Sequence, residues 1–90
     1  METITGRYAY IPNPCTTRPC LPGMAYAINA KGIDYFLTVA GRWFSENRPW
    51  NGYTPEPGDE VEVTGKISTQ KDIRGGEFRT IEVASLVPKQ

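Results

Sequence analysis

The most informative segment for the fold of this chain is PGDEVEVTGKI, residues 57–67. A Pro-Gly-Asp turn opens it, and polar and apolar residues then alternate strictly, which predicts a half-buried strand. A glycine inside such a strand favours a bulge or a sharp bend, the feature that closes a small barrel. We therefore expect Gly65 to be a closure residue and Glu60 and Glu62 to face solvent.

The same alternation, broken by turns, extends over most of the chain. It predicts four further strands, at residues 3–11, 24–30, 33–40 and 77–87. A break in phase before Leu86 predicts a bulge near Ala84 and Ser85. The residues predicted to point inward are Ile4, Gly6, Tyr8, Tyr10, Met24, Tyr26, Ile28, Ile33, Tyr35, Leu37, Val39, Ile81 and Val83.

Length and composition favour one all-β domain over residues 1–90. A chain of 90 residues lies near the lower limit for folding on a single hydrophobic core. Its 8 prolines and 9 glycines suit short strands joined by turns, and residues 42–47 have room for a helical turn or two at most.

Charge and hydropathy limit the classes of partner. Ten basic and ten acidic residues give a net charge of zero, which argues against strong attraction to nucleic acid or to an anionic membrane. No apolar run is long enough to span a membrane, and the N-terminus carries no visible export signal. We expect a soluble protein, cytoplasmic by default, with the compartment left open.

Three of the four connections between the predicted strands are longer than a two-residue turn. The first, residues 12–23, holds four prolines and both cysteines, so it is expected to be a stiff loop. The last, residues 69–76, carries Lys71, Arg74 and a Gly-Gly pair expected to let the loop adapt to a ligand. The long connection at 41–58 contains four aromatic residues expected to plug the open end of a barrel: Trp43, Phe44, Trp50 and Tyr53.

Five strands with this spacing resemble the OB-fold (oligonucleotide/oligosaccharide-binding) superfamily. The matching segments are ITGRYAYI, AYAINAKGIDYFLTV, PGDEVEVTGKI and FRTIEVASLV. The resemblance implies a small five-stranded Greek-key barrel with at most a short helical turn between its third and fourth strands. It also implies a ligand groove over the second and third strands, between the first and last loops. No closer family is identified.

Four residues follow from this resemblance as candidate ligand contacts. Phe36 is predicted to lie on the outer face of the third strand, on the floor of the groove, where it can stack on a base or a sugar. Arg18 in the first loop, with Lys71 and Arg74 in the last, are predicted to contact phosphates. The alternative is that these cations are solvated loop charges.

Two interpretations of Cys15 and Cys20 remain open. In an oxidising compartment they are expected to form a disulfide within the loop; in a reducing one they are incidental thiols. With two cysteines and no histidine, the chain lacks the four ligands of an ordinary intrachain zinc site. No metal or other cofactor is predicted.

We expect a non-enzymatic binding module. The chain has no histidine, and no serine or cysteine lies in a motif that activates a nucleophile. Weak binding of single-stranded nucleic acid is the leading expectation. A protein-interaction or assembly module is the alternative, together with binding of a small ligand or an oligosaccharide through Trp50 and Tyr53.

Overall fold

In the computed structural model, which describes residues 1–16 and 23–89, the chain folds entirely as β-structure. Within those ranges it has no helix, and so none long and apolar enough to cross a membrane. The strands are β1 (Glu2–Pro12), β2 (Met24–Ala30), β3 (Ile33–Val39), β4 (Arg42–Trp43), β5 (Glu60–Lys71) and β6 (Glu77–Pro88).

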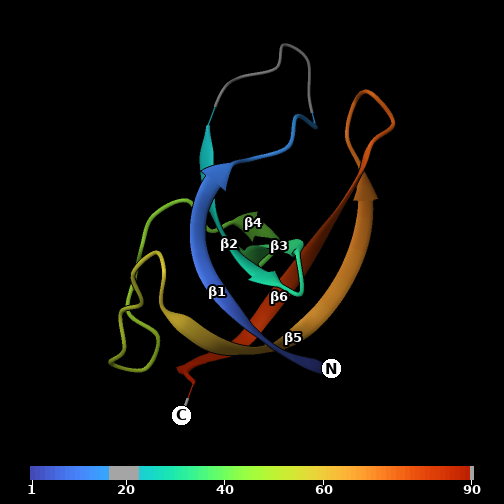
Figure 1. Cartoon of the computed structure of the whole chain (residues 1–90). Coiled ribbons are helices and arrows are strands. Elements are labelled where there is room, and N and C mark those ends of the chain that lie inside the picture. The colour runs from blue at the N-terminus through green and yellow to red at the C-terminus, as the bar shows by residue number, and fades with distance from the viewer. Residues whose placement is uncertain (17–22, 90) are drawn as a thin grey trace.

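Five of these strands close into a barrel (Figure 1). β1 pairs with β2 on one side and with β5 on the other, β5 pairs with β6, and β2 pairs with β3. β3 and β6 complete the ring as its one parallel pair. The predicted fold class, an all-β chain that forms a small five-stranded barrel, is confirmed. Residues 42–47 form no helix. The first two of them form β4, which pairs antiparallel with β3.

The barrel core consists of the inward-facing residues of the alternating strands. Its buried members are Tyr8, Ile28, Leu37, Phe44, Val61, Val63, Ile81 and Leu86. Four residues predicted to point inward are instead more than one-third exposed: Tyr10, Met24, Ile33 and Val39. Met24, Ile33 and Val39 are each the first or last residue of their strands, where fewer neighbouring elements cover the side chain, and Tyr10 lies close to the end of β1.

Two glycines allow the strongly bent strands to approach closely. A Cβ on Gly65 would overlap the carbonyl oxygen of Glu82, and a Cβ on Gly6 would overlap that of Asn29. The β5–β6 register also shifts between Thr64 and Gly65, which leaves Ala84 as an extra residue on β6. The predicted closure at Gly65 and the predicted bulge near Ala84 are both confirmed.

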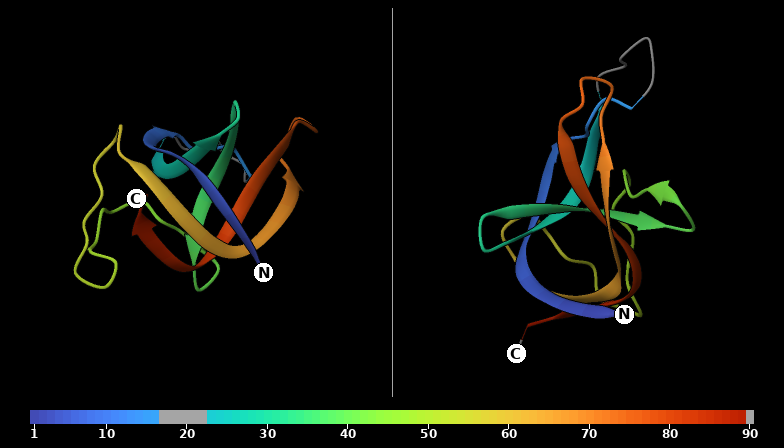
Figure 2. Two further views of the ribbon diagram at one scale, coloured as in Figure 1. Left: turned by 60° about the horizontal axis from the view of Figure 1, so that its bottom comes forward. Right: turned by 90° about the vertical axis from the view of Figure 1, so that its right-hand side faces the viewer.

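The long connection between β4 and β5 covers one end of the barrel (Figure 2, left). Phe44 belongs to the barrel core, and Trp50 and Tyr53 pack against it, as predicted. The hydroxyl of buried Tyr8 donates to Oδ1 of Asn47, at 2.8 Å. Burial, followed by the influence of Tyr26 and Tyr53, raises the pKa of the Tyr8 hydroxyl above its ordinary 10.0.

Candidate ligand-binding face

A second hydrophobic cluster lies outside the barrel core, on the outer faces of the strands. We call it the outer-face cluster; its members are Ile11, Ala25, Ala27, Phe36, Trp43 and Phe78. The ring centroid of Phe36 lies 5.6 Å from that of Trp43 and 6.3 Å from that of Phe78, both edge-on. Such edge-to-face geometry is the favoured arrangement of packed aromatic rings. Aromatic side chains of three strands thus form one packed unit on the outer surface.

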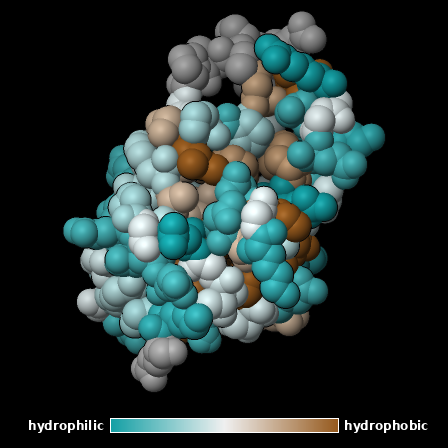
Figure 3. Space-filling model, viewed as in Figure 1, coloured by the Kyte–Doolittle hydropathy of each residue, from teal (hydrophilic) through white to brown (hydrophobic). Residues whose placement is uncertain are grey.

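This cluster lies on the side of the barrel below the β1–β2 and β5–β6 connections. In Figure 3, tan and brown residues lie on this face among hydrophilic residues in teal. The two connections are tied to each other, because the backbone N–H of Ile73 donates to the carbonyl oxygen of Cys15 at 2.9 Å. One side of the face is therefore bounded by a joined pair of loops.

The β5–β6 loop has a defined internal structure. Oδ1 of Asp72 accepts hydrogen bonds from the backbone N–H groups of Arg74 and Gly76, at 2.8 and 2.9 Å. Gly75 adopts a φ of 85°, in the left-handed region that favours glycine. The Gly75–Gly76 pair was expected to let this loop adapt to a ligand. In the structure the pair belongs to a tight turn around Asp72, and adaptation of the loop to a ligand stays a prediction.

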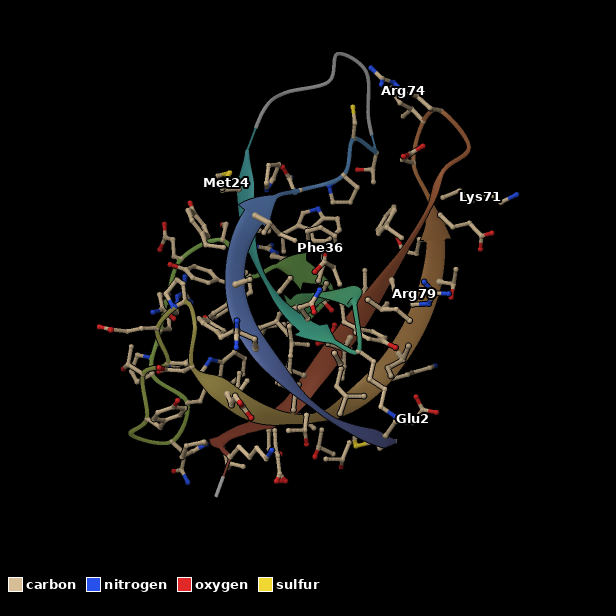
Figure 4. The ribbon with its side chains drawn as sticks, viewed as in Figure 1. Glu2, Met24, Phe36, Lys71, Arg74 and Arg79 are labelled. Carbon is tan, nitrogen blue, oxygen red and sulfur yellow. The ribbon has the colours of Figure 1, made fainter. Side chains whose placement is uncertain are left out.

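Phe36, Lys71 and Arg74, the predicted contact residues that the structure describes, do not form one open groove. Phe36 lies on the outer face of β3, as predicted, but it is only 7% exposed, because Trp43 and Phe78 pack over it. Lys71 points to the side, away from Phe36, and Arg74 lies at the far tip of its loop (Figure 4). Arg18 lies outside the described residues. The expected exposed Phe36 platform is therefore wrong.

Trp43 is the aromatic residue that sequence reasoning misplaced. It was expected to plug the barrel end with Phe44, but it belongs to the outer-face cluster and stays partly exposed. The signal was present in the sequence: adjacent residues of an extended strand face opposite sides, so an inward Phe44 requires an outward Trp43.

A cleft of about 520 Å³ lies beside Trp43, at the β3–β4 turn. Arg42, Trp43 and Arg48 all contribute to its lining. Arg48 forms an ion pair with Glu46 at 3.6 Å, and both side chains are largely exposed. Sequence reasoning missed this site because Arg42 and Arg48 look like ordinary surface residues in the sequence, and only the folded chain brings them to one cleft with the partly exposed Trp43.

Glu82 of β6 fixes the turn that forms one wall of this cleft. Its carboxylate accepts hydrogen bonds from the Thr38 hydroxyl at 2.9 Å and from the backbone N–H groups of Ala40 and Gly41 at 2.7 and 2.9 Å. Burial alone raises the pKa of Glu82, but the donors Gly41, Thr38 and Ala40 outweigh it, so the pKa lies below its ordinary 4.5. The charged carboxylate is thus built into the turn.

The acidic residues of the PGDE turn have structural partners. The Asp59 carboxylate accepts hydrogen bonds from the Tyr53 hydroxyl at 3.3 Å and from the Glu56 backbone N–H at 3.0 Å. Glu60 forms an ion pair with Lys89 at 3.2 Å. Burial, followed by the nearby charge and hydrogen bond of Asp59, raises the pKa of Tyr53. Both carboxylates thus have partners within the protein at this end of the barrel.

Trp50 and Tyr53 bear on the oligosaccharide alternative. Each backbone N–H donates to the other's carbonyl oxygen, at 2.6 and 3.0 Å, which makes a small isolated bridge. The Trp50 ring lies 4.9 Å from that of Phe44, and both side chains pack against the barrel core. Their rings are therefore engaged with the core and do not form an open pair.

Cys15 is disulfide-bonded. Cys20 lies outside the described residues, so the predicted Cys15–Cys20 pairing stays a prediction. Within residues 1–16 and 23–89, no three His, Cys, Asp or Glu side chains gather in a way that would hold a metal ion.

Comparison with known proteins gives no match of any kind: no family model fits the chain, and no curated protein or solved structure resembles it significantly. The arrangement of its own residues is thus the basis on which its function is inferred.

Proposed function

We propose that this protein is a non-enzymatic binding module of the OB class that binds single-stranded nucleic acid weakly on the outer face of its barrel. The outer-face cluster is the observation that carries this proposal. Aromatic rings on a barrel surface bind bases by stacking, and stacking tolerates any sequence because every base has a flat face. Trp43, as the aromatic ring of the cluster that remains partly exposed, is the residue expected to stack.

The position of the outer-face cluster also supports single-stranded nucleic acid as the ligand. In OB barrels, oligonucleotides lie over the second and third strands, between the first and last loops. Phe36 and Trp43 come from β3 and β4, and Ala25 and Ala27 come from β2. The ligand face proposed here therefore overlaps the face that such barrels use.

Charge sets the expected strength of binding. Net charge is zero, so the long-range attraction to a polyanion is small and binding depends on local cations. Lys71 and Arg74 are exposed near one side of the face, and Arg42 and Arg48 are exposed near Trp43. With about three phosphate contacts, log K should fall with log[salt] with a slope of about −2. A dissociation constant in the range of about 10⁻⁴ to 10⁻⁶ M is expected, as for other non-specific binders.

Fluorescence anisotropy with a labelled oligo(dT) strand at low and high salt tests this proposal. The double variant Lys71→Ala/Arg74→Ala should bind more weakly and show a shallower salt dependence. Lys31→Ala is the matched control, because Lys31 is an exposed cation in the β2–β3 turn, away from the β5–β6 loop. Absence of binding at low salt, or binding that salt does not affect, would overturn the proposal.

A protein-interaction module is the second candidate, and one observation favours it. Tyr10 is 43% exposed and Met24 is 38% exposed, and the pairing of β1 with β2 places them as neighbours at one end of the sheet. Two large exposed apolar side chains on a protein of zero net charge favour a surface that binds another protein. Affinity capture with and without nuclease separates the two: recovery of one stoichiometric protein that resists nuclease favours this candidate.

A further inference from the structure

The cleft beside Trp43 has the size and the chemical groups of a binding site. Its volume of about 520 Å³ lies within the usual range for small-ligand sites, roughly 300–1,000 Å³. Trp43 contributes to its lining, and so do the two cationic residues Arg42 and Arg48. A flat aromatic surface next to two cations suits a ligand that is itself a flat ring joined to an anion.

The Trp43 ring is held in place from behind. The Trp43 ring centroid lies 5.6 Å from that of Phe36 and 5.9 Å from that of Phe78, so two rings of the outer-face cluster support it. Glu82 fixes the adjoining turn through Ala40 and Gly41. A side chain that is already ordered loses little conformational entropy on binding, which favours its use as a stacking surface.

The two arginines differ in how available they are to an anion. Arg42 is exposed and makes no ion pair within the described part of the chain. Arg48 is paired with Glu46, but their side chains are 72% and 80% exposed, so solvent screens the pair and it is worth little. An incoming phosphate can therefore replace Glu46 at low cost, while Glu46 reduces the net positive charge that the phosphate meets.

We propose that this cleft is a subsite for one nucleotide of a single strand, with the base against Trp43 and its phosphate held by Arg42 and Arg48. The inference rests on the proposed function and adds to it the location of one bound nucleotide and an acidic residue that limits the affinity. It makes Glu46 a negative determinant of affinity, since the carboxylate competes with the phosphate for Arg48.

Titration of labelled oligo(dT) against surface variants of the full chain tests the subsite. Arg42→Ala should weaken binding about fivefold to tenfold. Glu46→Gln should tighten it about threefold and steepen the salt dependence, which a purely structural role of Glu46 would not produce. All of these side chains are exposed, so folding is expected to be unaffected, and Lys31→Ala serves again as the control.

The stacking contact needs a separate readout. In ¹H–¹⁵N spectra, the indole N–H resonance of Trp43 should shift on addition of oligo(dT), whereas that of Trp50, which packs on the barrel core, should move little. An abasic strand of the same length retains the phosphates but has no bases; it should bind more weakly and leave the Trp43 resonance in place. Equal binding of the two strands would overturn the base contact.

The outcomes separate this inference from the proposed function. If oligo(dT) binds but is indifferent to Arg42→Ala and Glu46→Gln, with no change at Trp43, the subsite and the stacking role of Trp43 are wrong, and weak binding of single-stranded nucleic acid by this protein stands. If wild-type protein binds no oligo(dT) at low salt, the proposed function is wrong and the subsite fails with it.

Discussion

The hydroxyl of Tyr8 donates a 2.8 Å hydrogen bond to Oδ1 of Asn47, and this bond joins the barrel core to the connection that covers its end. Nδ2 of Asn47 in turn donates to the carbonyl oxygen of Pro55 at 2.7 Å. One amide thus links a buried β1 residue to the segment that precedes β5. The connection has no helix or long strand of its own, so such side-chain bonds determine its path.

We expect Asn47→Ala to lower the free energy of unfolding by about 2 kcal/mol, because it removes two hydrogen bonds and leaves the buried Tyr8 hydroxyl unsatisfied. Urea denaturation at neutral pH measures the change. Tyr10→Phe is the control, because it removes a hydroxyl from a side chain that is 43% exposed, and it should change stability by less than about 0.5 kcal/mol. A loss for Asn47→Ala no larger than the control's would contradict the role given to Asn47.

Stability should fall in alkali because of Tyr8. Its pKa in the folded protein is raised above the ordinary 10.0, so the unfolded chain loses this proton first as the pH rises. The contribution is therefore complete below about pH 10 and is lost as the pH rises toward the folded value. Denaturation midpoints at pH 8, 9.5 and 11 should show this decline, and Tyr8→Phe should show a smaller one. Parallel curves for the two proteins would contradict the prediction.

Glu82 should make stability fall in acid. Its pKa in the folded protein lies below the ordinary 4.5, so its contribution is present above about pH 4.5 and is lost as the pH falls through the folded value. Glu82→Gln weakens the bonds from Thr38, Ala40 and Gly41 and should cost about 1 kcal/mol at pH 7. The difference between the two proteins should shrink at pH 3. A difference that persists unchanged at pH 3 would show that packing, and not the charge, explains the loss.

Gly65→Ala should destabilise the barrel by about 3 kcal/mol, the upper part of the usual range for overpacking, because its Cβ has no space beside the Glu82 carbonyl. Gly32→Asn is a matched control in an open position: Gly32 has a φ of 80° with nothing near its added Cβ, and asparagine tolerates that conformation. Thermal unfolding of the two variants compares them. A melting temperature for Gly65→Ala equal to that of the control would mean that the strands can separate at no cost.

Local sequence patterns accounted for much of the fold. Alternation in residues 57–67 identified a barrel strand because the side-chain period of a strand is two wherever one face is buried. Gly65 and the phase break before Leu86 located the bulge for the same reason: each interrupts that period. These features depend on neighbours in the chain, so they can be predicted from it.

The exposure of outward-facing residues could not be predicted in the same way. Phe36 was correctly placed on the outer face of β3, yet its cover comes from Phe78, 42 positions later, and from Trp43, which a tight turn folds back onto β3. Arg74 shares the β5–β6 loop with Asp72, whose hydrogen bonds set the loop's shape, whereas Lys71 is the last residue of β5. The direction of Arg74 depends on those bonds and not on its spacing from Lys71.

Strand alternation and glycine are local signals, so the all-β barrel, its bends and most of its inward-facing residues could be predicted from the sequence. Which aromatic ring stays accessible, and which cations lie beside it, depends on the tertiary structure. Pairing of β3 with β4 and β6 buries Phe36, leaves Trp43 partly exposed and places Arg42 and Arg48 at the same cleft. The exposure of a side chain depends on which distant segments pack together, and the alternation of residues along the chain does not contain that information.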